Sequence, residues 1–403
     1  MFMTAKKDKN FCRKSNQGKR FNRQFAAKAF FVLALFMAMF WQPNQEFALA
    51  AAEPQIGSAA AILIDAETGC VLWEQNGYQL KEPASTTKIL TALLTLDMAD
   101  VSEQTAISQK TAAVGESSAN LQVGEIFTVE NLLKGALVKS ANDACYALGE
   151  AVCGSEPLFV HWLEMKAQTL GAYDAVLANT NGLPAENHFL SAYDLAMIAR
   201  TDLQNQLFRE IVGSRQIKME GGCYIRTFKN TNKLLNQEYV IGIKTGTTDN
   251  AGACLVSAMA KDGRTVIAVV LHSPDRYGES LQLLNYGIEN FENITYVEKG
   301  DALGYYPLGA DEEKGVMSEA GSDGVYTVEK GEKSKNKNYR VVYNWRQNAE
   351  NIKAGDLLGT AVLENGSEKL QYINLLAKTD GDYGRFYRIW YKLTNGIKRI
   401  FVG

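Results

Sequence analysis

A Ser-Thr-Thr-Lys stretch at residues 85–88 runs straight into the mainly apolar segment Ile89 to Leu96, and this pairing constrains the fold most. Residues after Lys88 are apolar on nearly every side, which predicts a buried helix from about Ser85 to Met98. Residues three apart share one helix face, so we expect the Ser85 hydroxyl to meet the Lys88 amine. A serine beside an amine favours acyl-transfer chemistry, although an ordinary helix start can carry the same pattern.

The first fifty residues have the texture of an export signal. They carry nine Lys or Arg residues against two acidic ones, followed by the apolar run Ala29 to Trp41 and the sequence Ala48-Leu49-Ala50. A basic region, a short apolar region and an A-x-A site are typical of a signal peptide. The apolar run is shorter than the ~20 residues of a spanning helix. We therefore expect residues 1–50 to be removed and the mature protein to be exported.

Charge and metal-ligating residues exclude two classes of function. The chain has 42 basic and 45 acidic residues, and loss of the signal leaves an acidic mature protein without a basic arm, which argues against nucleic-acid binding. The six cysteines are scattered with no C-x-x-C pair, and the three histidines are dispersed. The sequence therefore predicts no metal site, no disulfide framework and no organic cofactor.

The pattern of strands and helices predicts two folded domains. At 403 residues the chain exceeds what one core usually holds. Two short apolar runs, 60–65 and 70–74, have the pattern of a β-hairpin, and helical segments follow them. Strand patterns return at 240–244, 251–260 and 265–272. A predicted helix at 278–291 comes after them. This order favours an α/β (α+β) class: an antiparallel sheet with helices on its faces, at residues 54–293. Short alternating runs then predict a small all-β domain at residues 296–380.

The end of the chain has a different character. Residues 385–403 alternate basic side chains such as Arg388 and Lys392 with apolar and aromatic ones such as Trp390 and Phe401. On a helix this pattern is amphipathic, as in segments that lie on a membrane surface. Gly396 weakens a helix, so a last strand with a docked tail is the alternative.

Two further motifs strengthen the proposal for Ser85. Ser140-x-Asn142 falls at a predicted helix break, and Lys244-Thr245-Gly246 falls at the end of a predicted strand, where glycine permits close approach of a ligand. Ser-x-x-Lys, Ser-x-Asn and Lys-Thr-Gly together are the signature of penicillin-binding proteins and class A β-lactamases. On these motifs the chain resembles the low-molecular-mass penicillin-binding proteins, the serine D-Ala-D-Ala carboxypeptidases. The resemblance covers residues 56–292 and continues more weakly through the β-rich region.

The resemblance implies a penicillin-binding, β-lactamase-like catalytic domain that cleaves D-Ala-D-Ala in peptidoglycan stem peptides and is acylated by β-lactam antibiotics. It also implies a place at the outer face of the cytoplasmic membrane. Ser85 would be the nucleophile, Lys88 its base and Ser140 a proton relay, with the pKa of Lys88 lowered by burial and by Lys244. Substrate would be bound by a second group of residues, in which Thr247 supplies an oxyanion N–H and Arg276 clamps the carboxylate: Asn142, Lys244, Thr245, Gly246, Thr247 and Arg276. His188 is expected to have a structural role, hydrogen bonding within a loop.

Three alternatives remain at this point. A β-lactamase on the same fold would need a Glu-x-x-Leu-Asn motif, which is not present downstream of Ser140. A D,D-endopeptidase would cut a chemically similar bond in cross-links. A wall-binding protein without activity would have no need to retain the three motifs.

Overall fold

The computed structural model describes residues 53–222, 224–307, 315–331, 339–346, 352–365 and 368–380. The predicted export signal and the predicted amphipathic segment at 385–403 therefore lie outside the described residues, and both stay predictions. No helix in the described part of the chain has the length and apolar character that crossing a lipid bilayer requires.

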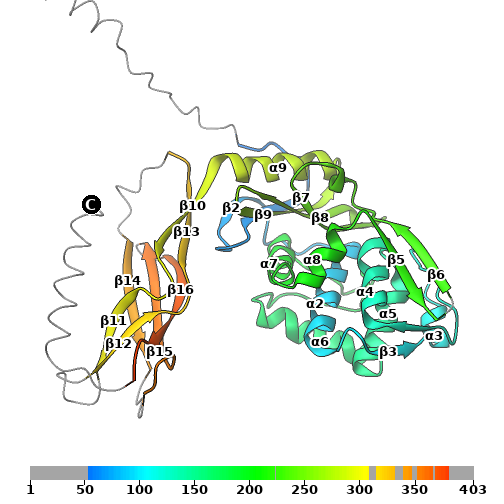
Figure 1. The fold of residues 1–403 in the computed structure, drawn as a ribbon. Coiled ribbons are helices and arrows are strands. Elements are labelled where there is room, and N and C mark those ends of the chain that lie inside the picture. Colours follow the sequence, from blue (N-terminus) through cyan, green and yellow to red (C-terminus); the bar gives the residue numbers. More distant parts are fainter. Residues whose placement is uncertain are drawn as a thin grey trace, which may run out of the picture. The chain divides into compact units, whose positions relative to one another are not determined.

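The first folded region is built on a five-stranded antiparallel sheet (Figure 1). In spatial order its strands are β2 (Val71–Gln75), β1 (Ala60–Asp65), β9 (Arg264–Ser273), β8 (Gly252–Lys261) and β7 (Val240–Thr248). The predicted hairpin at 60–74 and the predicted strands at 240–272 are confirmed, because every neighbouring pair is antiparallel.

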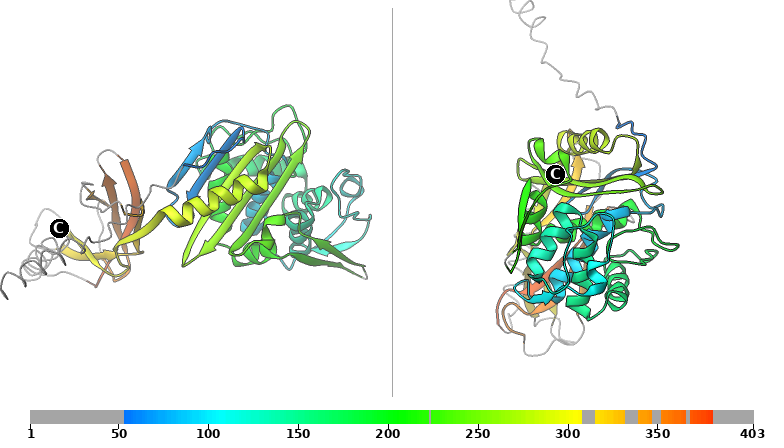
Figure 2. Two further views of the ribbon diagram at one scale, coloured as in Figure 1. Left: turned by 90° about the horizontal axis from the view of Figure 1, so that it is seen from above. Right: turned by 90° about the vertical axis from the view of Figure 1, so that its right-hand side faces the viewer.

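Helices cover both faces of this sheet, as Figures 1 and 2 show. The helices are α2 (Lys88–Met98), α3 (Gln109–Ala112), α4 (Val129–Lys134), α5 (Asn142–Cys153), α6 (Glu156–Thr169), α7 (Ala192–Asp202), α8 (Gln206–Gly213) and α9 (Arg276–Asn290). Alternate residues of β1 point to opposite faces. Ile62 and Ile64 join the cluster that contains α2 and α7, whereas Leu63 joins the cluster with Leu283 of α9.

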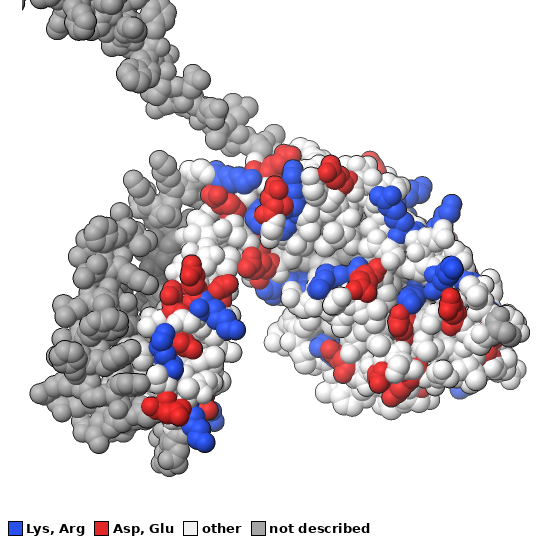
Figure 3. Space-filling view, viewed as in Figure 1, with Lys and Arg blue, Asp and Glu red and all other residues white. Residues whose placement is uncertain are grey.

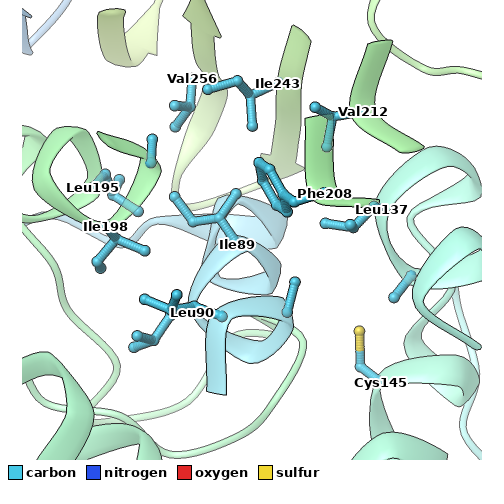
Figure 4. Packing of buried hydrophobic residues seen from close by; sticks show 14 of the residues in the cluster. Ile89, Leu90, Leu137, Cys145, Leu195, Ile198, Phe208, Val212, Ile243 and Val256 are labelled. Atoms are coloured by element: carbon cyan, nitrogen blue, oxygen red, sulfur yellow. The ribbon is translucent and has the colours of Figure 1, made fainter. Parts of the chain in front are cut away.

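Helix α2 lies at the centre of the larger cluster. Figure 4 shows Ile89 of α2 below Ile243 of the sheet, with Leu195 and Phe208 of neighbouring helices on either side of it. From Lys88 to Thr95 every residue of the helix is buried, which confirms the buried helix predicted from the sequence. Its start differs, because residues Ala84–Thr87 form a 3₁₀ turn, η1, and the α-helix begins only at Lys88. Ser85 therefore lies in the tight turn before the helix.

Two small hairpins flank the helices. The first pairs β3 (Gln104–Ala106) with β4 (Ile126–Thr128), and the second pairs β5 (Gln216–Gly221) with β6 (Tyr224–Lys229). A 3₁₀ turn, η3 (Lys233–Asn236), connects the second hairpin to β7.

The second folded region is β-rich, as predicted. Strands β10 (Phe291–Val297) and β13 (Gly324–Glu329) form one antiparallel pair. A five-stranded sheet has the order β11 (Ala302–Pro307), β12 (Gly315–Ala320), β16 (Glu368–Ala377), β15 (Leu357–Asn365) and β14 (Tyr339–Trp345). The fold class predicted from the sequence is thus confirmed in both parts.

Candidate active site

The three motifs meet at Lys88. Its Nζ donates to Ser85 Oγ at 2.8 Å, to Asn142 Oδ1 at 2.8 Å and to the backbone oxygen of Asn181 at 2.6 Å. The amine is completely buried, yet all three of its donor positions have partners. Ser85 and Asn142 were predicted from the sequence to lie here. Asn181 was not, because a backbone carbonyl leaves no signature in residue type.

Burial decides the protonation of Lys88. It lowers the pKa of this amine to about 8, against the opposing influence of Cys145 and of the carboxylates of Asp143 and Glu116. A pKa near 8 leaves about a tenth of the molecules with a neutral amine at pH 7, enough for a general base. The predicted lowering by burial is therefore confirmed.

Lys244, on strand β7, is the second buried cation of the site. Its Nζ donates to the backbone oxygen of Thr245 at 2.8 Å. Burial first, and then the positive charge of Lys88, lower the pKa of Lys244 well below its usual range. Repulsion between the two buried lysines therefore favours a neutral amine in this site, as the sequence argument expected.

The loop before α5 brings Ser140 and Asn142 to the site. Helix α4 continues into a π-helical turn, Gly135–Lys139, which ends at Ser140 in a left-handed conformation with φ 65°. Such turns often occur at functional sites. Asn142 Nδ2 donates to Gly115 O at 3.1 Å, which fixes the amide with its oxygen toward Lys88. Among the described residues no hydrogen bond joins Ser140 Oγ to Ser85, Lys88 or Lys244, so the predicted relay is not formed in this state.

Asp143, which sequence reasoning did not single out, holds the neighbouring loop. Its carboxylate accepts from Ser118 Oγ at 2.6 Å and from the backbone N–H groups of Ala119 and Leu121, both at 3.0 Å. The loop that carries Gly115 is thereby fixed against α5.

Strand β7 lies directly against the turn that carries Ser85. A side-chain carbon added to Gly246 would lie 3.0 Å from Pro83 O and 3.1 Å from Ser85 N. A side chain at this position would crowd the turn, so glycine favours the close approach of β7 to Ser85. The Lys-Thr-Gly motif was predicted at a strand end, but it lies in mid-strand, because β7 continues to Thr248.

Arg276 completes this side of the site. It is the first residue of α9, and its Nη1 donates to Thr247 Oγ1 at 2.7 Å and to Gly246 O at 2.8 Å. On the other side, Thr245 Oγ1 lies 2.7 Å from Thr231 Oγ1. Among the described residues, every predicted site residue except Ser140 thus has a hydrogen bond with another residue of the site. Thr231 is an addition that the motifs did not indicate.

His188 has the structural role expected for it. Its Nδ1 accepts from the backbone N–H of Ala178 at 3.0 Å, and its Nε2 lies 2.8 Å from Thr87 Oγ1. Burial, and then the charge of Lys88, lower the pKa of His188 to about 4.

Groups suited to a metal ion are not found here. Within the described ranges, no cluster of three or more His, Cys, Asp or Glu side chains has a metal-binding arrangement.

Family models and curated proteins match most of this chain. The family model described as D-alanyl-D-alanine carboxypeptidase matches residues 47–275, and that described as penicillin-binding protein 5, C-terminal domain, matches residues 291–382. The D-alanyl-D-alanine carboxypeptidase DacF of Bacillus subtilis is 28% identical, over 81% of this chain and 90% of its own length. DacC of Escherichia coli is also 28% identical, over 84% of this chain and 88% of its own.

Solved structures are similar as well. Penicillin-binding protein 5 of Haemophilus influenzae has a TM-score of 0.67 at 25% identity, over 81% of this chain and 98% of that one. PBP3 of Streptococcus pneumoniae, described as a peptidoglycan synthesis regulatory factor, has a TM-score of 0.64 at 27% identity, over 81% of this chain and 99% of that one.

Proposed function

The chain belongs to the D-alanyl-D-alanine carboxypeptidase family and is a serine-type carboxypeptidase, and on this premise we propose that Ser85 is its nucleophile. The reaction is release of the terminal D-Ala from peptidoglycan stem pentapeptides through an acyl-enzyme. The observation that carries this assignment is the 2.8 Å hydrogen bond between Lys88 Nζ and Ser85 Oγ, in a site where the amine is buried.

Acylation begins when a neutral Lys88 takes the proton of Ser85. The Ser85 oxygen attacks the carbonyl carbon between the two D-alanines, and the backbone N–H groups of Ser85 and Thr247 stabilise the oxyanion. The C–N bond then breaks, and the leaving nitrogen takes a proton, for which Ser140 is the proposed relay. Substrate binding would bring Ser140 Oγ within hydrogen-bond reach of the leaving nitrogen.

The terminal carboxylate of the substrate is held by charge and hydroxyl groups. Arg276 offers a planar guanidinium beside Thr247 Oγ1, and Lys244 and Thr245 lie two residues and one residue before Gly246 on the same strand. A carboxylate paired with a guanidinium forms strong, directional hydrogen bonds. Asn142 Nδ2 and Oδ1 are already engaged by Gly115 and Lys88, so Asn142 positions the base as well as facing the substrate.

Deacylation of penicillin is expected to be slow. A β-lactamase uses a carboxylate to activate water on the penicillin ester, and among the described residues no carboxylate hydrogen bonds to Ser85, Lys88 or Asn142. Penicillin should therefore inhibit this enzyme and not be consumed by it, which separates it from a β-lactamase.

The test is the intact mass of the purified mature protein after incubation with benzylpenicillin. We expect one stable adduct per molecule in the wild type and none in Ser85→Ala. Rapid loss of penicillin without an adduct would instead assign β-lactamase chemistry. If the wild type shows no adduct and no loss of penicillin, the acyl-serine mechanism is overturned.

We further propose that the enzyme works on the wall side of the cytoplasmic membrane. The basic and apolar pattern of residues 1–50 supports export, and the basic and aromatic pattern of residues 385–403 supports attachment to the membrane surface. A chain that ends after residue 384 should lose flotation with anionic vesicles, while the full mature chain floats. Equal flotation of both would remove the membrane role.

A further inference from the structure

A basic pocket of about 340 Å³ lies where the β5–β6 hairpin meets the turn η3. Three cationic and three amide side chains contribute to its lining: Arg215, Lys229, Lys233, Asn230, Asn232 and Asn236. None of the described residues that line it is acidic. Figure 3 shows Lys and Arg side chains gathered near the upper end of β5 and β6. A hollow lined by charges of one sign concentrates ions of the other sign, so this pocket favours a small anion.

The three cations of the pocket have no counter-ion in the described part of the chain. None of them forms a salt bridge there. Arg215 Nε donates to Leu235 O at 3.1 Å, and the two terminal nitrogens of this guanidinium have no hydrogen bond to any described residue. Positive charges around one space repel one another, and an anion between them turns this repulsion into attraction.

Hydrogen bonds fix the walls of the pocket. The backbone N–H of Asn230 donates to Arg215 O at 2.8 Å, and its Nδ2 donates to Ser214 O at 3.0 Å. Lys229 is paired across the hairpin with Gln216. The backbone that carries the cations is therefore held in place before any ligand arrives, which lowers the entropic cost of binding.

Asn232 leaves one donor unused at this pocket. The residue is 3% exposed, and its Oδ1 accepts from the N–H of Leu234 at 3.0 Å. Its buried Nδ2 has no hydrogen-bond partner in the structure. A buried amide N–H without a partner is costly, and an oxygen of a bound ligand would satisfy it.

This set of donors fits a phosphate group better than a carboxylate. A guanidinium binds two phosphate oxygens through its planar fork, and ammonium groups bind phosphate as point charges. The donors come from three stretches of chain, at Arg215, at Lys229 and at Asn232 with Lys233. A carboxylate offers two oxygens in one plane. The oxygens of a phosphate are arranged tetrahedrally, so donors that approach from different stretches can share them.

The pocket is separate from the catalytic site, because the two have no residue in common. Thr231 lies between them. Its Oγ1 is 2.7 Å from Thr245 Oγ1 on the catalytic side, and its flanking residues Asn230 and Asn232 line the pocket. A ligand in the pocket therefore leaves Ser85 open to its own substrate.

We propose that the pocket around Lys229, Lys233 and Asn232 binds a phosphate group, and that it holds this side of the catalytic domain to a phosphate-bearing polymer or lipid outside the cytoplasmic membrane. The binding of phosphate depends neither on the acyl-serine mechanism nor on export. Only the source of the phosphate rests on the proposed location of the enzyme.

The first experiment titrates the full mature protein with inorganic phosphate at constant ionic strength and follows binding by phosphorus NMR. The dissociation constant is expected to rise about tenfold or more in Lys229→Gln/Lys233→Gln, because two charge-assisted contacts are lost. Lys110→Gln/Lys218→Gln is the matched control. It loses the same charge from exposed lysines that do not line the pocket, and its dissociation constant should equal that of the wild type.

Two further variants test the position of the anion. Asn232→Asp keeps the oxygen that accepts from Leu234, replaces the unpartnered Nδ2 by a negative oxygen and should abolish phosphate binding. Arg276→Ala removes the guanidinium of the catalytic site and should leave phosphate binding unchanged. Cooperative thermal unfolding like that of the wild type shows that each variant is folded.

A second experiment identifies the source of the phosphate. A soluble glycerol-phosphate oligomer and vesicles of phosphatidylglycerol are each tested for binding to the wild type and to Lys229→Gln/Lys233→Gln. Weaker binding of the variant to the oligomer assigns a polymer, and weaker binding to the vesicles assigns a lipid headgroup. Equal binding of the two proteins to both probes would overturn the attachment role.

Three results of the titration would overturn the phosphate site. The first is a wild type that binds no phosphate, or that binds acetate as tightly as phosphate. The second is an equal dissociation constant in Lys229→Gln/Lys233→Gln and in the wild type. The third is loss of binding in Arg276→Ala, which would place the anion in the catalytic site. None of these results touches the acylation of Ser85, which is measured separately with penicillin.

Discussion

Nε2 of His188 lies 2.8 Å from Oγ1 of Thr87, and this contact joins the turn of the nucleophile to a chain segment a hundred residues away. Because Nδ1 of His188 accepts from Ala178 N–H, the proton is on Nε2, and the ring donates to Thr87. Thr87 Oγ1 in turn donates to Ala84 O at 2.9 Å, beside Ser85. The chain of hydrogen bonds requires a neutral histidine.

Acid should therefore destabilise the enzyme through His188. Its folded-state pKa of about 4 lies below the ~6.5 of an unfolded chain. The unfolded state binds more protons between these values, so the stabilisation is complete above pH 6.5 and is lost as pH falls toward 4. Between pH 7 and 5 the loss is about 2 kcal/mol. The free energy of unfolding is measured with urea at both pH values for the wild type and for His188→Gln. The wild type should lose about this much more stability than the variant, beyond the pH dependence that the two proteins share. Parallel pH dependence in the two proteins would contradict the assignment.

The pKa of Lys88 predicts the pH profile of acylation. Since the base must be neutral, the rate of penicillin acylation should rise with pH and level off above about pH 8. Lys88→Ala should lower that rate by a factor of about 10³ or more, because the variant has no base. Stopped-flow fluorescence or quenched mass spectrometry measures both. A rate independent of pH from about 6 to 9 would assign the proton to another group.

Arg276 is predicted to act on the substrate carboxylate. Arg276→Ala should lower kcat/KM for a D-Ala-D-Ala peptide about a hundredfold, whereas Arg276→Lys should recover only part of this, because an ammonium lacks the planar fork. Release of D-Ala is the measurement. A peptide amide without the terminal carboxylate serves as control. If Arg276→Ala lowers its cleavage equally, the residue supports β7 instead of binding the carboxylate.

Gly182 is predicted to tolerate no side chain. It has φ +81°, and an added carbon would lie 1.8 Å from Ala84 O. Gly182→Ala should cost about 3 kcal/mol or more and abolish penicillin acylation. Gly171→Ala is the matched control, since Gly171 has φ +91° but nothing within 4 Å. The control should lose only about 1 kcal/mol. Similar losses in both would show that backbone strain, not the contact with Ala84, decides the effect.

Much of the site could be predicted because its chemistry is carried by side-chain types at fixed spacing. Ser85 and Lys88 are three residues apart, and their meeting follows from helical geometry. Their exact setting, a 3₁₀ turn before the helix, depends on the packing of Gly182 and Gly246 against Ala84. No local pattern encodes such long-range contacts.

The parts that sequence missed share a physical cause. Asn181 acts through its backbone carbonyl, and Thr231 and Asp143 act through partners distant in sequence. The mid-strand place of Lys244 follows from pairing with β8 up to Thr248, which is a property of the sheet. The β-rich region could be predicted because its strands show a local alternation of apolar and polar residues, which is visible in the sequence alone.

Because Lys88 needs all three of its acceptors, reaction of Ser85 with penicillin reports whether the chain is correctly folded. Asn142 and Asn181 lie 54 and 93 residues from Lys88 along the chain, so the amine is fixed beside Ser85 only after both of these remote segments have packed against α2. A molecule with either of them out of place would keep its serine and still fail to react. Fluorescent penicillin on a denaturing gel would therefore count correctly folded chains directly, during refolding or in a crude extract, without separating them from the rest.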